Sequence, residues 1–316
     1  MLELNKIYNM DCLEGLKQLD DNSINCCVTS PPYWGLRDYG VEGQLGLEST
    51  PEEYVAKMVE VFREVKRVLR DDGTLWLNLG DCYNGSGGAG GDYNKGGLKE
   101  GQPKYPGRKI AGLKPKDLVG IPWMVAFALR ADGWYLRQDI IWHKPNPMPE
   151  SVRDRCTKAH EYIFLLSKSK KYYYDAEAIK EKQSGEIKTR RFSSDGGAKA
   201  RAMGKHISGG NEGTGAKWTD TGYRNKRSVW TVATKPFKEA HFAVFPPDLI
   251  KPCILAGCPK DGIVLDPFMG SGTTGMVAAM HQRNFIGFEL NPEYCKMAEK
   301  RIEPYLIQQT IFKLSR

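Results

Sequence analysis

The sequence predicts an α/β fold in which a mostly parallel sheet is covered by helices on both faces. Apolar runs of strand length alternate along the chain with longer segments that carry one apolar stripe. Strands that alternate with helices of this length typically form parallel sheets. Two of the predicted strands end in unusual motifs, within residues 28–40 and 262–290. The 316 residues, of which 41% are hydrophobic, are enough for a sizeable core.

The first predicted strand, Ile24–Ser30, runs into a stiff corner. Pro31 and Pro32 fix φ and donate no backbone N–H, so the corner presents carbonyl oxygens without competing donors. Two large aromatic residues, Tyr33 and Trp34, follow at once. The simplest alternative is that the prolines only end the strand and that Tyr33 packs in the core.

The middle of the chain predicts a regular series of elements. A helix begins after Thr50, because Thr50 and Glu53 have capping-box spacing and Pro51 suits the first helical position. Its apolar stripe continues up to Asp71–Gly73. The elements predicted next are the strand Leu75–Leu79, the helix Ile121–Asp132, and the strands Tyr135–Trp142 and Tyr162–Leu166.

The second motif, GIVLDPFMGSGTTGMVAAMHQRNFIGFEL at residues 262–290, predicts a strand, a tight glycine turn, a helix and another strand. Asp266 ends the first strand, and Glu289 ends the second one 23 residues later. In nucleotide-binding βαβ units the glycines let the backbone approach the ligand, and the second acid accepts ribose hydroxyls. Gly270, Gly272 and Gly275 form the pattern G-x-G-x-x-G. By itself this pattern is equally compatible with NAD binding or with a turn that needs glycine only for packing. Asp266 and Phe268 within the turn favour a cationic ligand over a pyrophosphate.

The net charge of +8 is concentrated in one segment. Residues 151–230 hold 18 Lys and Arg against 9 Asp and Glu, so the rest of the chain sums to about −1. Aromatic residues are interleaved with these basic ones, a combination typical of nucleic-acid binding. The glycine-rich stretches 85–112 and 183–227 break the α/β pattern, and long loops of this kind are usually functional or disordered.

Cysteine usage and hydropathy predict a cytoplasmic protein. None of the eight cysteines forms a C-x-x-C pair, and several lie in apolar runs, so we expect buried, reduced thiols and no metal. No apolar stretch approaches the length of a membrane span, and the N-terminus lacks the layout of a signal peptide.

Taken together, Ser30–Tyr33 and Asp266–Thr274 closely resemble the motifs of the amino-methyltransferases of DNA, in the permuted order of their β group. The resemblance implies a Rossmann-like class I methyltransferase fold, S-adenosyl-L-methionine as cofactor with S-adenosyl-L-homocysteine as product, and double-stranded DNA as substrate. It also implies a catalytic half (1–174), a basic, loop-rich target-recognition region (175–230) and a cofactor-binding half (231–316).

The resemblance implies a role for each motif residue. Ser30 and Pro31 accept hydrogen bonds from the target amine, Pro32 keeps the corner stiff, and Tyr33 stacks on a base flipped out of the duplex. Contacts with the cofactor are implied for Asp11, Cys12, His241, Phe245, Asp266, Phe268, Gly270, Ser271, Gly272, Thr273, Thr274, Glu289 and Leu290. Contacts with DNA are expected for Trp34, Arg37, Lys188, Arg190, Arg191, Lys217, Arg224, Lys226 and Arg227.

Several alternatives stay open at this point. The resemblance implies cytosine N4 as the target, because the family has either Ser or Asp before Pro-Pro-Tyr and Ser, here Ser30, is the commoner residue in enzymes that methylate cytosine N4; adenine N6 is the alternative. An RNA methyltransferase and a non-enzymatic nucleic-acid binder are more remote ones. Asp11 also suits a helix N-cap, and His160–Glu161 is interpreted as structural. The resemblance further implies a homodimer and a restriction-modification system with a cognate endonuclease, or a stand-alone or phage-encoded modification enzyme.

Overall fold

The computed structural model describes residues 2–36, 38, 40–85, 112–183, 222–234 and 244–314. The chain divides into two compact units. Met1–Ala178 and Arg227–Arg316 together form the larger unit, and Ile179–Lys226 forms the smaller one.

The described part of the larger unit contains an eight-stranded sheet with the order β1-β10-β9-β2-β3-β5-β4-β8. β5 runs antiparallel to its neighbours β3 and β4, whereas the other neighbouring strands are parallel. The strands are β1 (Lys6–Asn9), β2 (Ile24–Thr29), β3 (Leu69–Leu79), β4 (Tyr135–His143), β5 (His160–Ser167), β8 (Val229–Thr231), β9 (Ile263–Asp266) and β10 (Asn284–Glu289).

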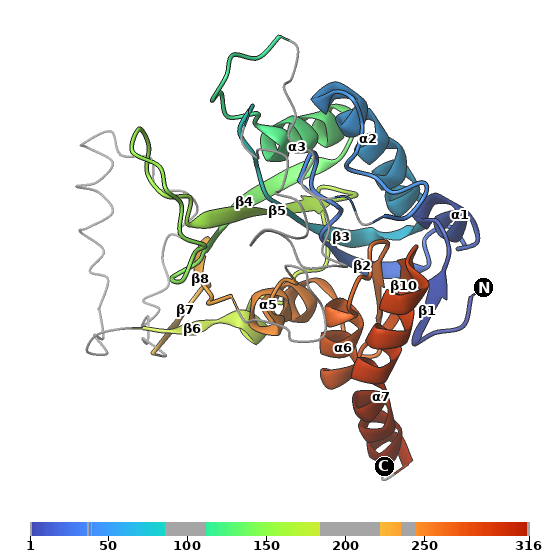
Figure 1. Ribbon diagram of the computed structural model, residues 1–316. Helices are drawn as coiled ribbons and strands as arrows, with labels where there is room; N and C mark the ends of the chain where they lie inside the picture. Colours follow the sequence, from blue (N-terminus) through green and yellow to red (C-terminus); the bar gives the residue numbers. More distant parts are fainter. Residues whose placement is uncertain are drawn as a thin grey trace. The chain divides into compact units, whose positions relative to one another are not determined.

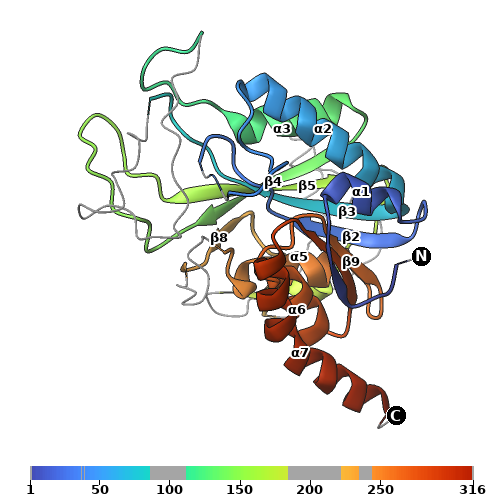
Figure 2. The same ribbon diagram turned by 45° about the vertical axis from the view of Figure 1, so that its right-hand side comes forward.

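Helices cover both faces of this sheet, as Figures 1 and 2 show. On one face lie α1 (Cys12–Lys17), α2 (Pro51–Val68) and α3 (Ile121–Ala131), and on the other lie α5 (Pro247–Gly257), α6 (Thr273–Met280) and α7 (Pro292–Leu314). The predicted α/β class with a mostly parallel sheet is therefore confirmed. None of the helices in the described ranges is long and apolar enough to cross a membrane.

The predicted capping box at the start of α2 is present. The Thr50 hydroxyl accepts from the Glu53 backbone N–H at 3.1 Å, and the Glu53 carboxylate accepts from the Thr50 N–H. The helix ends earlier than predicted, at Val68, because the chain turns directly into β3. Leu69 already pairs with Ile24, and the register of β2 and β3 then shifts, so that the predicted stop at residues 71–73 is a bulge in β3.

The main core lies between the sheet and the layer of α1, α2 and α3. Tyr54, Met58 and Phe62 of α2 are fully buried in one cluster with Leu75 and Leu77 of β3. Each such side chain contributes on the order of 1.5–3 kcal/mol by leaving water. This packing holds the carboxyl ends of β2 and β3 in fixed positions.

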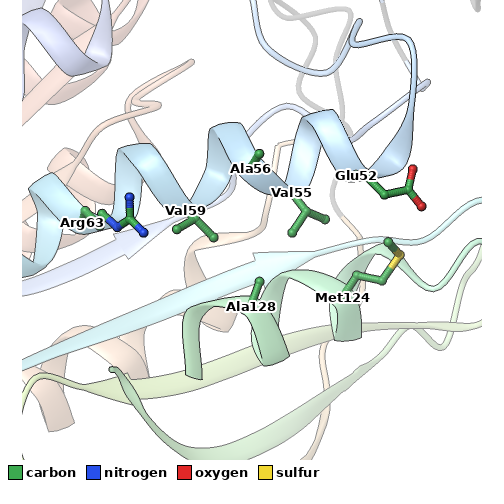
Figure 3. A pocket seen from close by; sticks show the side chains of 7 residues that line it. All are labelled: Glu52, Val55, Ala56, Val59, Arg63, Met124 and Ala128. Atoms are coloured by element: carbon green, nitrogen blue, oxygen red, sulfur yellow. The ribbon is translucent and has the colours of Figure 1, made fainter. Parts of the chain in front are cut away.

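An open groove of about 560 Å³ lies between α2 and α3 (Figure 3). It is lined by Glu52, Val55, Ala56, Val59, Arg63, Met124 and Ala128. None of these residues belongs to the motifs that the sequence analysis assigned to catalysis or to the cofactor, so the candidate site lies elsewhere.

The described part of the smaller unit contains a two-stranded antiparallel sheet. β6 (Glu181–Lys182) pairs with β7 (Tyr223–Arg224), and a 3₁₀ helix at Glu177–Ile179 precedes β6 along the chain. The guanidinium Nε of Arg224 lies 2.8 Å from the carboxylate of Glu181, so this ion pair joins the two strands.

Candidate active site

The two sequence motifs lie side by side at one edge of the sheet. β2 pairs with β9 in parallel, with Cys26 opposite Val264 and Cys27 opposite Leu265. The Ser-Pro-Pro-Tyr corner follows β2 and the glycine turn follows β9, so both project from the carboxyl ends of adjacent strands. Ligands of open parallel sheets bind outside these ends.

Asp266 ties the two motifs together. Its carboxylate accepts hydrogen bonds from the hydroxyls of Thr29 and Thr274, each at 2.6 Å, and from the Phe268 N–H at 3.0 Å. Only 1% of Asp266 is exposed, and burial raises the pKa of its carboxyl to about 6 although the three hydrogen bonds favour the ionised form. The side chains of Asp266 and Thr274 thus join β9, β2 and α6.

Gly270 and Gly272 of the turn are required for different structural reasons. Gly270 and Gly272 adopt φ values of +52° and +80°, in the left-handed region that favours glycine. A Cβ on Gly272 would come within 2.7 Å of the Ala298 Cβ, so this glycine is needed for packing against α7. The nearest atom to a Cβ on Gly270 would be the Phe268 carbonyl oxygen at 3.9 Å. Space therefore remains beside Gly270.

Arg301 of α7, which the sequence analysis did not single out, holds the same turn. Its Nη1 donates to the carbonyl oxygen of Ser271 at 3.2 Å, to the Ser271 hydroxyl at 3.0 Å and to the Thr273 hydroxyl at 2.9 Å. Burial lowers the pKa of this guanidinium below its usual value. The hydroxyls of Ser271 and Thr273 are thus engaged by α7 at the start of α6.

Glu289 lies at the end of β10, next to the glycine turn. One carboxylate oxygen accepts from the Gly270 N–H and the other from the Asn291 N–H, both at 2.8 Å. Burial raises the pKa of Glu289 above its usual value, against these two hydrogen bonds. Each oxygen of a carboxylate has a second lone pair, so the side chain retains capacity to accept further hydrogen bonds.

The end of β1 reaches the same edge. The side-chain amide of Asn9 donates to the carbonyl oxygens of Glu289 and Leu290, each at 2.9 Å. Asp11 follows as the N-cap of α1, where its carboxylate accepts from the backbone N–H groups of residues 13 and 14. The alternative considered for Asp11 is therefore present in the structure. Burial raises the pKa of the Cys12 thiol to about 12, so this thiol stays protonated.

At the Ser-Pro-Pro-Tyr corner, Tyr33 is held at its hydroxyl and along its ring. The hydroxyl donates to Glu161 at 2.8 Å, lies 3.1 Å from the Asn78 side-chain oxygen and accepts from the Ser30 hydroxyl at 3.4 Å. Burial and the charge of Glu161 raise its pKa well above the usual value. A Cβ on Gly80 would come within 2.5 Å of the ring, so the half-buried ring lies against the backbone there.

Glu161, interpreted as structural from the sequence, thus fixes the Tyr33 hydroxyl through a hydrogen bond. Its second carboxylate oxygen forms an ion pair with Lys144, whose Nζ lies 4.3 Å from the centre of the Trp142 ring. Lys158, two residues before β5, donates to the carbonyl oxygen of Asp81 at 2.6 Å. Burial lowers the pKa of Lys158. Polar groups from β3, from β5 and from the loop between β4 and β5 therefore lie next to one another beside the corner.

The expectation that Trp34 contacts DNA is wrong. Only 2% of this residue is exposed, it packs in the core, and its indole N–H donates to the Glu48 carbonyl oxygen at 3.0 Å. The neighbouring corner is fixed from α2, where the Tyr54 hydroxyl donates to the Pro32 carbonyl oxygen at 2.9 Å. Trp34 and Tyr54 thus stabilise the corner from within.

Five further predicted residues lie within the described ranges. Phe245 is half-buried just before α5, Leu290 is half-buried after β10, Lys226 is half-buried and Arg227 is exposed. Arg224 is engaged by Glu181 within the smaller unit. The predicted residues outside the described ranges are Arg37, Lys188, Arg190, Arg191, Lys217 and His241.

This sheet and these adjoining motifs define a protein with the class I methyltransferase fold. A family model described as DNA methylase, of the N6/N4 methyltransferase type, matches residues 24–300. The chain belongs to this family, so the family recognised from the two motifs is confirmed and the protein is a DNA methyltransferase of the N6/N4 type.

Relatives and solved structures agree with this assignment. The chain is 48% identical to the Type II methyltransferase M.Cfr9I of Citrobacter freundii over 312 residues, which cover 96% of this chain and 89% of that protein. It is 48% identical to the Type II methyltransferase M.SmaI of Serratia marcescens, covering 94% and 90% of the two chains.

Among solved structures, the PvuII DNA methyltransferase (cytosine-N4-specific) matches with a TM-score of 0.61 and 19% identity, covering 96% of this chain and 90% of that one. TTHA0409 of Thermus thermophilus, complexed with S-adenosyl-L-methionine, matches with a TM-score of 0.56 and 22% identity, covering 95% and 93%. At these identities the likeness concerns the fold.

Proposed function

We propose that the protein transfers the methyl group of S-adenosyl-L-methionine to cytosine N4 of a base flipped out of double-stranded DNA. The observation that carries the proposal is the adjacency of the two motifs. Thr29, next to the Ser30 corner, donates to Asp266, and Thr274 of α6 donates to Asp266 and lies 3.3 Å from the Val28 carbonyl oxygen. A base held at the corner would therefore lie beside a ligand held at the glycine turn.

The residues around the glycine turn fit the cofactor. Glu289 ends the strand beside the turn with acceptor capacity left for two ribose hydroxyls, and Gly270 leaves space for a ligand to approach the backbone. Phe268 is half-buried next to them. We assign binding to these three residues, and we assign positioning of the turn to Asp266 and Arg301. When bound, S-adenosyl-L-methionine supplies an electrophilic methyl group on a sulfonium.

The corner supplies alignment for the target amine. The lone pair of an exocyclic amine is delocalised into the base, which makes the nitrogen a poor nucleophile. Acceptors at the Ser30 hydroxyl and the Pro31 carbonyl draw the nitrogen towards tetrahedral geometry and direct its lone pair. The Tyr33 ring, fixed by Glu161 and Gly80, stacks on the flipped base and compensates part of the unstacking cost. Catalysis then rests mainly on orientation and electrostatics.

The choice of cytosine N4 rests on Ser30, because the resemblance implies that serine before Pro-Pro-Tyr is the commoner residue in enzymes that methylate cytosine N4. Serine and aspartate can each accept from the amine, and a ring nitrogen lies beside the amine in both cytosine and adenine, so the preference comes from the family pattern. The name of the PvuII enzyme states cytosine-N4 specificity for that protein, which is in keeping with this proposal. Adenine N6 is the alternative product.

We assign target recognition to residues 175–230, because the positive charge of the chain is concentrated around them. Binding to DNA through Lys and Arg releases counterions, so affinity should fall steeply with salt. The relatives named above are Type II methyltransferases. By analogy we place this protein in a restriction-modification system.

The experiment is to incubate the protein with labelled S-adenosyl-L-methionine and either duplex DNA or RNA, and then to identify the modified nucleoside by mass spectrometry. We expect N4-methylcytosine from DNA. Ser30→Ala should lower kcat at least about tenfold, with an unchanged cofactor Kd, because its contact is made with the base. Ser23→Ala, just before the opposite end of β2, is the matched control. N6-methyladenine alone would overturn the base assignment, and methylation of RNA alone would overturn the DNA assignment.

A further inference from the structure

The loop between β4 and β5, residues 144–159, begins and ends next to the Ser-Pro-Pro-Tyr corner. β4 ends and the antiparallel β5 begins at the edge of the sheet where β2 and β3 end. At one end of the loop Lys144 pairs with Glu161, the partner of Tyr33. At the other end Lys158 donates to the carbonyl oxygen of Asp81, at the end of β3. The loop therefore projects from the candidate site itself.

Met148 is the most exposed residue among the large hydrophobic side chains described, with 85% of its surface accessible. It lies in the sequence Pro145-Asn146-Pro147-Met148-Pro149, in which each proline fixes φ. The side-chain amide of Asn146 forms two hydrogen bonds with the backbone of Thr234. Its oxygen accepts from the Thr234 N–H at 2.9 Å, and its nitrogen donates to the Thr234 carbonyl oxygen at 3.1 Å. The backbone that presents Met148 is thus stiff and anchored.

The part of the loop that follows Met148, residues 150–155, is anchored as well. Arg155 forms an ion pair with Glu150 at 2.5 Å and lies 4.1 Å from the centre of the Tyr83 ring. Asp154 forms an ion pair with Lys116 at 2.5 Å. The loop is therefore anchored by contacts on both sides of Met148, whose apolar side chain is exposed.

We propose that Met148 is a wedge that enters the base stack of duplex DNA and fills the gap left by the flipped target base. Extruding a base leaves its neighbours unstacked, and proteins that open base steps insert apolar side chains such as Met, Leu or Pro between them. A wedge must be apolar, supported by its backbone and carried by a segment that adjoins the pocket that receives the base. Met148 is apolar and exposed, its loop is anchored by hydrogen bonds and ion pairs, and both ends of that loop contact residues at the corner. The inference rests on the proposed function, since it assumes a flipped base at Tyr33.

The test compares methylation of a matched duplex with that of a duplex in which the target base lies opposite a mismatch or an abasic position. Unpairing costs less in the second duplex. We expect Met148→Ala to methylate the matched duplex at least about tenfold more slowly than wild type, and the weakened duplex at nearly the wild-type rate. Met148→Leu, which retains an apolar wedge, should retain most activity on both. Met280→Ala, at the end of α6 on the opposite edge and with Met280 46% exposed, is the control.

Two results would overturn the wedge. One is a Met148→Ala protein that matches Met280→Ala on the matched duplex. The other is a defect of equal size on both duplexes, which would mean that base extrusion is not the step affected. Failure of the proposed function gives a different pattern, because the wild-type protein would then methylate neither duplex. A fluorescent base analogue at the target position gives a second measurement, since its emission rises on unstacking and this rise should diminish in Met148→Ala.

Discussion

Removing the Tyr33 hydroxyl tests how the Ser-Pro-Pro-Tyr corner is held in place. Tyr33→Phe keeps the ring but deletes a buried donor that lies 2.8 Å from the Glu161 carboxylate. A hydrogen bond to a charged group contributes about 1.5–3 kcal/mol. Glu161 keeps its ion pair with Lys144, so its charge is not left without a partner. We therefore expect the free energy of unfolding to fall by about 2 kcal/mol.

The same change should slow catalysis without weakening cofactor binding. The Phe ring can still stack on a base, but its orientation is no longer fixed, so kcat should fall about tenfold while the cofactor Kd stays constant. Denaturant unfolding and single-turnover methylation measure the two effects. In a double-mutant cycle with Glu161→Gln, the coupling energy should be at least about 1 kcal/mol.

The matched control for this cycle is Tyr8→Phe. The Tyr8 hydroxyl donates to the Glu3 carbonyl oxygen at 3.1 Å on the surface, so its loss should change the unfolding free energy by no more than about 0.5 kcal/mol. A Tyr33→Phe protein with wild-type stability and turnover, or a coupling energy with Glu161 near zero, would refute the reasoning.

Three further predictions concern the glycine turn. Glu289→Gln should weaken binding of S-adenosyl-L-methionine by about 1–3 kcal/mol in calorimetry, because it loses a charged acceptor; unchanged affinity in a folded variant would contradict the assignment. Arg301→Met should lower both the unfolding free energy, by about 1–3 kcal/mol, and the cofactor affinity, whereas the exposed neighbour Lys300→Met should change neither. Asp266 has a pKa raised from 3.8 to about 6, so the folded protein holds this proton more tightly than the unfolded chain, and this contribution to stability is lost as the pH rises from about 4 to above 6. The unfolding free energy of wild type minus that of Asp266→Asn should therefore fall by about 3 kcal/mol over this range, and a constant difference would argue against it.

The elements nearest the two motifs could be predicted because their signals are local. A capping box, an apolar stripe and a glycine turn are each contained within a few residues, so the observed α2, α6, β9 and β10 lie close to the predicted segments. The residue types in the Ser-Pro-Pro-Tyr corner and the Asp-Pro-Phe turn also carry their own chemistry. The sequence motifs were therefore sufficient to recognise the family before any strand order was known.

Side-chain direction within a motif was harder to predict. Tyr33 and Trp34 are adjacent and both aromatic, yet the Tyr33 ring is half-buried at the site and the Trp34 ring is in the core. Their different positions depend on tertiary contacts. Tyr33 contacts Glu161 through its hydroxyl and Gly80 through its ring, whereas the Trp34 indole donates a hydrogen bond to the Glu48 carbonyl oxygen. The same holds for the turn glycines, since Gly272 is required by Ala298 of a helix that follows it in the sequence.

The contact between Glu161 and Tyr33 could not be predicted from the sequence because it depends on strand direction. A search for site residues in a parallel sheet looks at the residues that follow each strand, where Ser30 and Glu289 lie. β5 runs antiparallel to β3 and β4, so the residues at its start, not those after its end, lie at the site. Glu161 is 128 residues from Tyr33 along the chain, and their contact depends on the sheet order β2-β3-β5. An antiparallel strand therefore brings its first residues, and the loop that leads into it, to the edge of the sheet where β2 and β3 end. For this reason the proposed roles of Glu161 and Met148 concern one region of the protein, although nothing in their local sequence connects them.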